Sequence, residues 1–186
     1  MAFRSKTYVT YHDDFSRDIK SDDVMYVKKL LDWKVRDQDH ISYINSREKA
    51  SAIADKDQQL KLVHAIKDRL ANSTNLLVIM ETTVKEDSPW VRFEIEWAVD
   101  HCKIPIIAAY QGYDTVLAPA NLEHHWPQAL DLRIKNATAQ AVHVPFKMEP
   151  VQRALGQFTH DNLPKGGLSA YTQAAYDRWG LNSEGE

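Results

Sequence analysis

The sequence predicts a single α/β domain built on a doubly wound parallel sheet of five strands. Short runs of apolar and β-branched residues alternate with amphipathic segments of helical period along most of the 186 residues. Strands that alternate with helices over short connections are typical of a parallel sheet covered by helices on both faces. Two continuous apolar runs, 75–80 and 104–110, have the composition of strands buried on both faces.

The first half of the chain contains two of the predicted strands. Residues 6–11 (KTYVTY) form the first, and residues 41–45 (ISYIN) form the second. Apolar residues recur at helical spacing in 22–33 and again in 56–71, where charged residues occupy the other positions. These segments are therefore expected to be amphipathic helices that cover the sheet.

The second half continues the alternation. The third strand is 75–80, and Ser88 with Pro89 is a favoured start for the helix over 88–102. The fourth strand is 104–110 and the fifth is 141–146, which Pro145 places at an edge because proline cannot donate a ladder hydrogen bond. The region 111–140 is expected to be irregular.

Right-handed crossovers make the flavodoxin-like strand order 2-1-3-4-5 the expected topology. Ligands of such sheets bind beyond the carboxyl ends of the strands, which here means the loops 12–20 and 81–87. The domain is expected to span 1–158. Residues 159–186 are a C-terminal extension whose short helix, 169–179, should dock through Tyr171 and Trp179.

The composition excludes several classes of protein. A net charge of −3 and a pI near 6.2 argue against binding nucleic acid. The single cysteine, Cys102, excludes an internal disulfide and favours a reducing cytoplasm. The N-terminus lacks a signal-peptide pattern, and no apolar run approaches the roughly 18 residues of a membrane span. His124 and His125 lack the further ligands of a metal site, so no metal is predicted.

The stretch 88–98 (SPWVRFEIEWA) carries the clearest chemical pattern. Its helical period puts Val91, Ile95, Ala98 and Cys102 on the buried face. Glu94 lies in the next stripe, at the edge of the core, with tryptophans 90 and 97 one turn away on either side. A carboxylate between two indoles suits a ligand with aromatic rings and ribose hydroxyls. On pattern alone, a solvated boundary residue remains the alternative interpretation.

The string WVRFEI resembles the Trp-Val-x-x-Glu-Ile segment of TIR domains that cleave NAD, and especially the TIR-like protein of the Thoeris antiphage-defence system. The first strand and its end, YVTYHDD, are also similar to the start of that family. The resemblance covers about residues 6–110. It implies that Glu94, and not Glu96, is catalytic, and that NAD is a substrate with no separate cofactor.

The chemistry implied by the resemblance needs one carboxylate. Nicotinamide leaves NAD as a neutral molecule, so the charge that develops is an oxocarbenium ion on the ribose, which a carboxylate stabilises. Attack by water gives ADP-ribose, and attack from within the same molecule gives a cyclic isomer; the residues do not distinguish the two. The candidate substrate-binding residues are Thr10, Tyr11, His12, Thr82 and Trp90.

Three hypotheses about function follow. The first is a cytoplasmic NAD-cleaving enzyme whose nucleotide signal is sensed by a separate effector protein during antiphage defence. The second is a non-catalytic TIR-like adaptor that acts by self-association. The third is a nucleoside N-glycosyl transferase, which uses a related sheet and a glutamate that attacks the ribose. Release of nicotinamide from NAD discriminates the first hypothesis from the other two.

Overall fold

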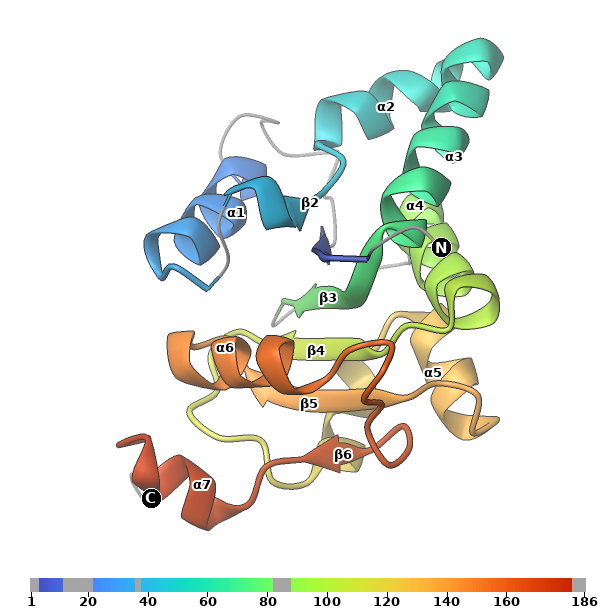
Figure 1. The fold of residues 1–186 in the computed structure, drawn as a ribbon. Coiled ribbons are helices and arrows are strands. Elements are labelled where there is room, and N and C mark those ends of the chain that lie inside the picture. Colours follow the sequence, from blue (N-terminus) through green and yellow to red (C-terminus); the bar gives the residue numbers. More distant parts are fainter. Residues whose placement is uncertain (1–3, 12–21, 36–37, 82–87, 182–186) are drawn as a thin grey trace.

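A computed structural model of the protein describes residues 4–11, 22–35, 38–81 and 88–181 (Figure 1). Its centre is one parallel sheet with the strand order β2-β1-β3-β4-β5-β6. The predicted α/β class, the parallel pairing and the order of the first five strands are therefore confirmed. The strand count differs, because a sixth strand extends the sheet beyond β5.

The strands are β1 (Lys6–Tyr11), β2 (Ile41–Ser42), β3 (Ser73–Met80), β4 (Ile106–Tyr110), β5 (Ala141–Pro145) and β6 (Ser169–Ala170). The α-helices are α1 (Asp22–Asp32), α2 (Ser46–Ala54), α3 (Lys56–Ala71), α4 (Pro89–Glu96), α5 (Gln128–Lys135), α6 (Met148–Gln157) and α7 (Gln173–Arg178). The 3-10 helices are η1 (Gln38–His40) and η3 (Pro119–His125), and η2 (Trp97–Cys102) is a π-helix that continues α4.

Helices cover both faces of the sheet, as expected for a doubly wound fold (Figure 1). One face packs against α3, α4 and α5 through a core that includes Ile66, Ile95 and Leu130. The other face packs against α1 and α6 through Leu30 and Val151. All eight residues of β3 are buried, as its apolar run predicts for a central strand.

The predicted bounds of β1 and α3 agree with the structure, and the helix that follows β3 begins at Pro89 as predicted. Ser88 occupies the N-cap position, although its side chain makes no capping hydrogen bond. The predicted continuous helix over 88–102 changes to the wider π-helical turn from Trp97 onward, and Lys103 ends it with a left-handed backbone at φ 55°. The side chains expected to be buried along this helix are buried: Val91, Ile95, Ala98 and Cys102.

The prediction that β5 lies at an edge of the sheet is wrong, since β6 pairs with it. β6 is bonded to β5 only at Val142 and His143. Pro145 lies beyond this short ladder, so the hydrogen bond that proline cannot donate is not needed there. The sequence predicts a helix from residue 169, where the structure has β6 instead. The prediction missed this strand because two residues carry no periodic signal.

Several helices have no counterpart in the predictions from sequence. The region 111–140 contains η3 and α5, and α2 and α6 are further additions. In the C-terminal segment, Tyr176 is the fully buried residue, and its hydroxyl donates to the carbonyl of Val116 at 3.3 Å. Tyr171 and Trp179 pack against each other with ring centroids 5.0 Å apart. The segment therefore docks through Tyr176, which the prediction missed, and through the predicted Tyr171, which packs against the core and donates to Gln157 at 2.9 Å.

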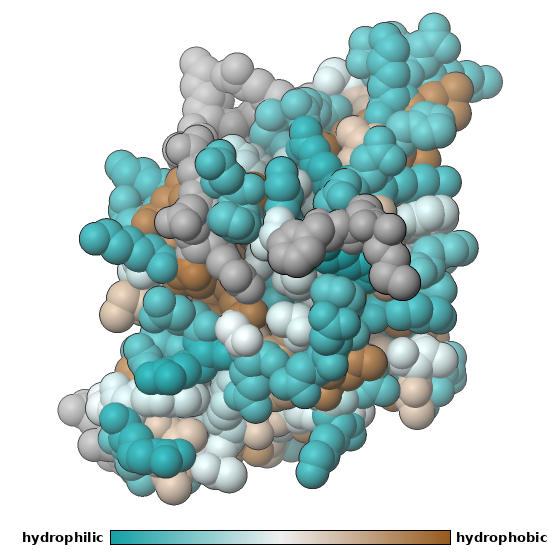
Figure 2. Space-filling model, in the orientation of Figure 1, coloured by the Kyte–Doolittle hydropathy of each residue, from teal (hydrophilic) through white to brown (hydrophobic). Residues whose placement is uncertain are grey.

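The face of the molecule in Figure 2 is largely hydrophilic, and its apolar groups lie in small patches between polar side chains. Of the helices in the described part of the chain, none has the length and apolar character needed to cross a membrane.

Candidate active site around Glu94

The helix α4 places Glu94 against the carboxyl half of β1. In α4, Ser88 occupies the N-cap and Pro89 the first helical position. Four residues of α4 are buried: Trp90, Val91, Glu94 and Ile95. A carboxylate is unusual in such a set because burying an ion costs several kcal/mol unless it is paired and hydrogen-bonded. The contacts of Glu94 supply both kinds of compensation.

Both oxygens of Glu94 accept hydrogen bonds. The hydroxyl of Tyr8 donates to Oε1 at 2.7 Å, and the hydroxyl of Thr10 donates to Oε2. Tyr8 and Thr10 are two positions apart on β1, so their side chains leave the strand on the same face. The ammonium of Lys49 lies 3.2 Å from Oε2 and forms an ion pair with it.

Lys49 reaches Glu94 from α2, which follows the short strand β2. Its side chain is only 1% exposed, and that of Glu94 is 0% exposed. The indole Nε1 of Trp90 donates to the carbonyl of Lys49 at 3.1 Å, so α4 holds the main chain of Lys49 as well as its ammonium. The ammonium also lies 5.7 Å from the ring centroid of Tyr11, within the range of a cation–π contact.

The tyrosine in this cluster stays protonated. Burial raises the pKa of Tyr8 well above its ordinary value, and the nearby negative charge of Glu94 raises it further. A phenol that keeps its proton at every physiological pH is a permanent donor to the carboxylate. Glu94 is therefore held in one orientation by two neutral donors and one cation, a preorganised arrangement of the kind that stabilises developing positive charge.

The structure brings four of the six predicted site residues together: Thr10, Tyr11, Trp90 and Glu94. The other two, His12 and Thr82, lie outside the described residues. Of these four, only Thr10 makes a direct hydrogen bond to the carboxylate, and Trp90 acts on the cluster through Lys49.

The expectation that Glu94 lies at the edge of the core between two indoles is wrong. Glu94 is fully buried because β1 places Tyr8 and Thr10 over the stripe that the helical pattern assigned to the boundary. Trp97 is half-buried and packs elsewhere: its ring stacks on His101 at 3.9 Å, and the ammonium of Lys67 lies 4.1 Å from its centroid. The surroundings of the buried carboxylate are thus polar on the side of β1.

Sequence reasoning missed Tyr8 and Lys49. The alternation of β1 was a usable signal for Tyr8, since it shares the face of Thr10. For Lys49 there was no comparable signal, because a lysine in a helix is almost always solvated.

The second carboxylate of α4 has a different environment, as predicted. Glu96 is 35% exposed and pairs with Arg92 at 3.1 Å and with Arg133 at 3.9 Å. These partners lie on the solvent side of α4 and α5, away from β1. Glu96 is therefore a surface ion-pair residue, and its charge contributes little to stability.

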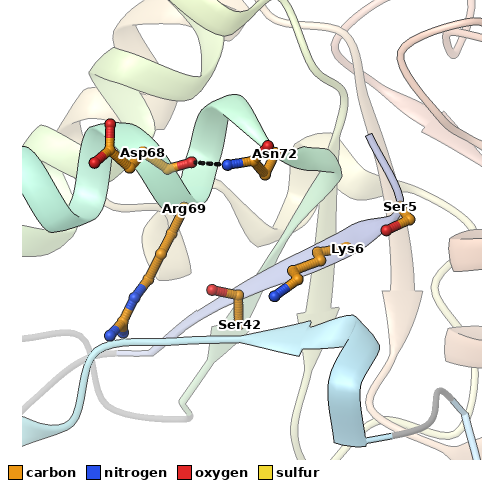
Figure 3. Close-up of a pocket in the computed structure, with 6 residues that line it drawn as sticks. All are labelled: Ser5, Lys6, Ser42, Asp68, Arg69 and Asn72. Atoms are coloured by element: carbon orange, nitrogen blue, oxygen red, sulfur yellow. Dashed lines mark hydrogen bonds between the residues drawn. The ribbon is translucent and has the colours of Figure 1, made fainter. Parts of the chain in front are cut away.

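A pocket of about 340 Å³ lies at the opposite end of β1 (Figure 3). It is lined by residues from β1, β2, α3 and their flanks: Ser5, Lys6, Ser42, Asp68, Arg69 and Asn72. The pocket is at the amino end of the strand, whereas ligands of doubly wound sheets bind beyond the carboxyl ends. In Figure 3 the side chain of Arg69 extends toward β2, where its guanidinium donates to the carbonyl of Tyr43.

The two adjacent histidines of η3, His124 and His125, make hydrogen bonds or ring contacts with neighbouring side chains. His125 is buried against Tyr113, whose hydroxyl lies 2.8 Å from Nε2, and burial lowers the pKa of His125. His124 stacks on His125 with ring centroids 4.0 Å apart. Within the described ranges, no group of three or more His, Cys, Asp or Glu side chains is placed to hold a metal ion.

Comparison with known proteins identifies the domain. The sequence family described as "Thoeris protein ThsB, TIR-like domain" matches residues 8–115, which are 108 of the 186 residues and include most of β1 and all of α2 and α4. No curated protein matches the chain significantly. The matched range contains every residue of the Glu94 cluster. The chain therefore belongs to the family of TIR-like domains of the Thoeris protein ThsB.

Proposed function

We propose that the protein cleaves NAD at the bond between nicotinamide and ribose, and that Glu94 is its catalytic carboxylate. The observation that carries the proposal is the placement of Glu94. It is an ionisable side chain buried at the carboxyl half of β1 and held by Tyr8, Thr10 and Lys49, within the range that matches the family. Charged groups are rarely buried without a function or a strong structural reason.

The proposed role of Glu94 is electrostatic. When the glycosidic bond breaks, nicotinamide leaves as a neutral base and positive charge develops on the ribose. Oε1 of Glu94 accepts one hydrogen bond among the described residues, from Tyr8, and a carboxylate oxygen has two lone pairs. We assign the second lone pair of Oε1 to a ribose hydroxyl or to the cationic carbon. Because Glu94 is fully buried in this structure, the substrate reaches it only after the covering side chains move.

Burial increases what this charge is worth. Two unit charges about 4 Å apart interact several times more strongly at the effective dielectric constant of a protein than in bulk water. An environment from which water is excluded also limits hydrolysis. This supports formation of a cyclic ADP-ribose isomer, by attack from within the same molecule, as the proposed outcome.

The family supports a role in antiphage defence. We propose that the product is a nucleotide signal and that a separate effector protein binds it. In this scheme NAD is a substrate that is consumed, and the reaction needs no separate cofactor, because the charge of the pyridinium in NAD itself makes nicotinamide a good leaving group.

The test is incubation of the protein with NAD, both as purified and in extracts of phage-infected cells that express it. The proposal predicts release of nicotinamide together with a product that is lighter than ADP-ribose by one water. If the product is ADP-ribose instead, the proposed cleavage stands and the proposed cyclisation is rejected. No release under either condition would contradict the proposal and favour the adaptor. Cleavage of free nucleosides with NAD left intact would favour the transferase.

A further inference from the structure

Lys49 is a lysine whose side chain is almost completely removed from solvent. Lysine is almost never fully buried unless it is paired, because its ammonium is strongly hydrated in water. The pair with Glu94 explains how Lys49 tolerates burial. It does not explain why a cation stands beside a carboxylate that is proposed to stabilise a developing cation.

The physical problem of the site is to keep a buried carboxylate ionised. Tyr8 and Thr10 donate hydrogen bonds to Glu94, but neither carries a charge. Without a cation, a buried carboxyl group takes up a proton more readily than it does in water. A protonated Glu94 would be useless for stabilising positive charge. Lys49 supplies the missing cation, and it does so at Oε2, on the side away from Oε1.

The geometry also fixes where the ammonium can go. The carbonyl of Lys49 is held by the indole of Trp90, one helical turn before Glu94 on α4. The ring of Tyr11 also contacts the ammonium, with its centroid 5.7 Å away. The backbone and the head of Lys49 are thus both tied to the element that carries Glu94. The ammonium therefore engages one oxygen and leaves the other for the substrate.

We infer that Lys49 is a positioning residue that keeps Glu94 ionised and turned so that Oε1 faces the substrate. The inference has two parts. That Lys49 orients Oε1 toward the substrate is the functional half, and it rests on the proposed cleavage of NAD. That Lys49 keeps Glu94 ionised is the electrostatic half, and it does not. Among the side chains that the structure describes, the titratable and charged groups that face Glu94 or its partners are Tyr8 and Tyr11 from β1, Lys49 from α2 and Arg69 from α3. Of these, Lys49 is the cation in direct contact with the carboxylate.

The electrostatic half is tested by the pH dependence of thermal stability. Lys49→Met keeps an unbranched apolar chain of nearly the same length and the main-chain bond to Trp90, and it removes the ammonium with its charge and its hydrogen bond to Glu94. In this variant the folded state binds a proton at Glu94 more readily than the unfolded state does, so stability is lost as pH rises. We expect the Tm to fall by roughly 10 °C at about pH 8 and by much less at about pH 5.

Three further variants make the result specific. Adding Glu94→Gln to Lys49→Met should abolish the extra pH dependence, since no buried charge is left. Lys49→Arg should recover most of the lost Tm. Lys61→Met removes the same ammonium from an exposed position on α3 and should leave the Tm unchanged. A Lys49→Met deficit that is equal at both pH values would overturn the inference, whether or not the protein cleaves NAD.

The functional half is tested by the pH profile of nicotinamide release. In Lys49→Met we expect the acidic limb of kcat/KM to move to higher pH, by at least one unit, with about a tenfold loss on that limb. Lys49→Arg should restore the position of the limb. A merely structural role would lower the amount of active enzyme without moving the limb. If the acidic limb of Lys49→Met lies at the same pH as that of the wild type, the positioning role is overturned. If the wild type does not cleave NAD, only the proposed function is rejected.

Discussion

The cluster around Glu94 carries two full charges, whereas the cluster around His143 is equally buried and holds together without any. Both lie on the sheet face that α3, α4 and α5 cover, the first at β1 and the second at β4 and β5. In the first, two neutral donors and an ammonium surround a carboxylate. In the second, every partner is neutral, and the contrast shows what a purely structural polar cluster in this fold looks like.

The neutral cluster is a chain of hydrogen bonds with a fixed direction. The indole of Trp126 donates to the hydroxyl of Tyr110 at 2.7 Å, and that hydroxyl lies 2.7 Å from Nδ1 of His143. Nε2 of His143 lies 2.8 Å from the carbonyl of Gly167. A carbonyl can only accept, so Nε2 carries the proton and Nδ1 accepts from Tyr110. Burial lowers the pKa of His143 to about 4, which keeps the ring neutral.

The two clusters differ in what they contribute to stability. A buried ion pair is often no more stabilising than well-packed apolar residues of the same volume, so stability alone is a weak reason for one. A neutral chain that satisfies every donor has no such cost. The fold demonstrates at His143 that it can bury polar groups without charge, and this makes the charge at Glu94 the feature that calls for a functional explanation.

The largest expected effect on stability comes from removing the C-terminal segment that supplies one partner of the neutral cluster. Deleting residues 166–186 removes Tyr176 from the core and the carbonyl of Gly167 from His143. We expect a loss of more than about 4 kcal/mol of unfolding free energy, about 3–5 from the aromatic ring and about 1–3 from the stranded imidazole. Chemical denaturation measures it. An unchanged midpoint would mean that the segment is a dispensable tail.

The next effect is the dependence of stability on pH that His143 contributes. Its pKa is about 4 in the folded protein and about 6.5 when unfolded, so the unfolded state binds more protons between these values. This contribution is complete above about pH 6.5 and is lost as pH falls toward 4, by about 3 kcal/mol in all. Denaturation of the wild type and of His143→Gln across this range isolates it, because other groups titrate in both proteins. Parallel curves would contradict the neutral assignment.

A matched pair of hydroxyl deletions sharpens the comparison with a smaller effect. Tyr8→Phe and Tyr110→Phe each remove one buried hydroxyl from one cluster. Each should cost about 1–3 kcal/mol, because a polar partner is left unsatisfied. Nicotinamide release should fall only in Tyr8→Phe, corrected for the amount of folded enzyme. Equal activity losses in the two variants would mean that the Glu94 cluster is structural too.

Much of the fold could be predicted because most of its strands and helices have residue patterns typical of their structure. The apolar run of β3, the β-favouring residues of β1 and the charged and apolar faces of α3 each carry enough residues to define an element. What could not be predicted is short or set by tertiary contacts. The two residues of β6 have no period, and their pairing depends on a chain reversal near Gly166, whose φ is 130°.

The site was predictable only in part for the same reason. The resemblance of WVRFEI to TIR domains pointed to Glu94, and the helical period gave its neighbours on α4. The degree of burial depends on β1 and α2, which lie far away in the sequence. Lys49 in particular is recognisable only once α2 packs its main chain against Trp90. A pattern within one helix cannot show which distant cation will balance its carboxylate.

The most direct test of the account compares nicotinamide release by the wild type, Glu94→Gln and Glu96→Gln under conditions where the wild type is active. Glu94→Gln keeps the shape of the side chain and removes the charge, and it should lower turnover by roughly 100-fold or more. Because it leaves Lys49 without its counter-ion, Glu94→Gln combined with Lys49→Met serves as a second, charge-balanced variant and should be equally inactive. Glu96→Gln removes a surface charge from the same helix and should retain most of the activity. Turnover by folded Glu94→Gln equal to that of the wild type would contradict the central claim.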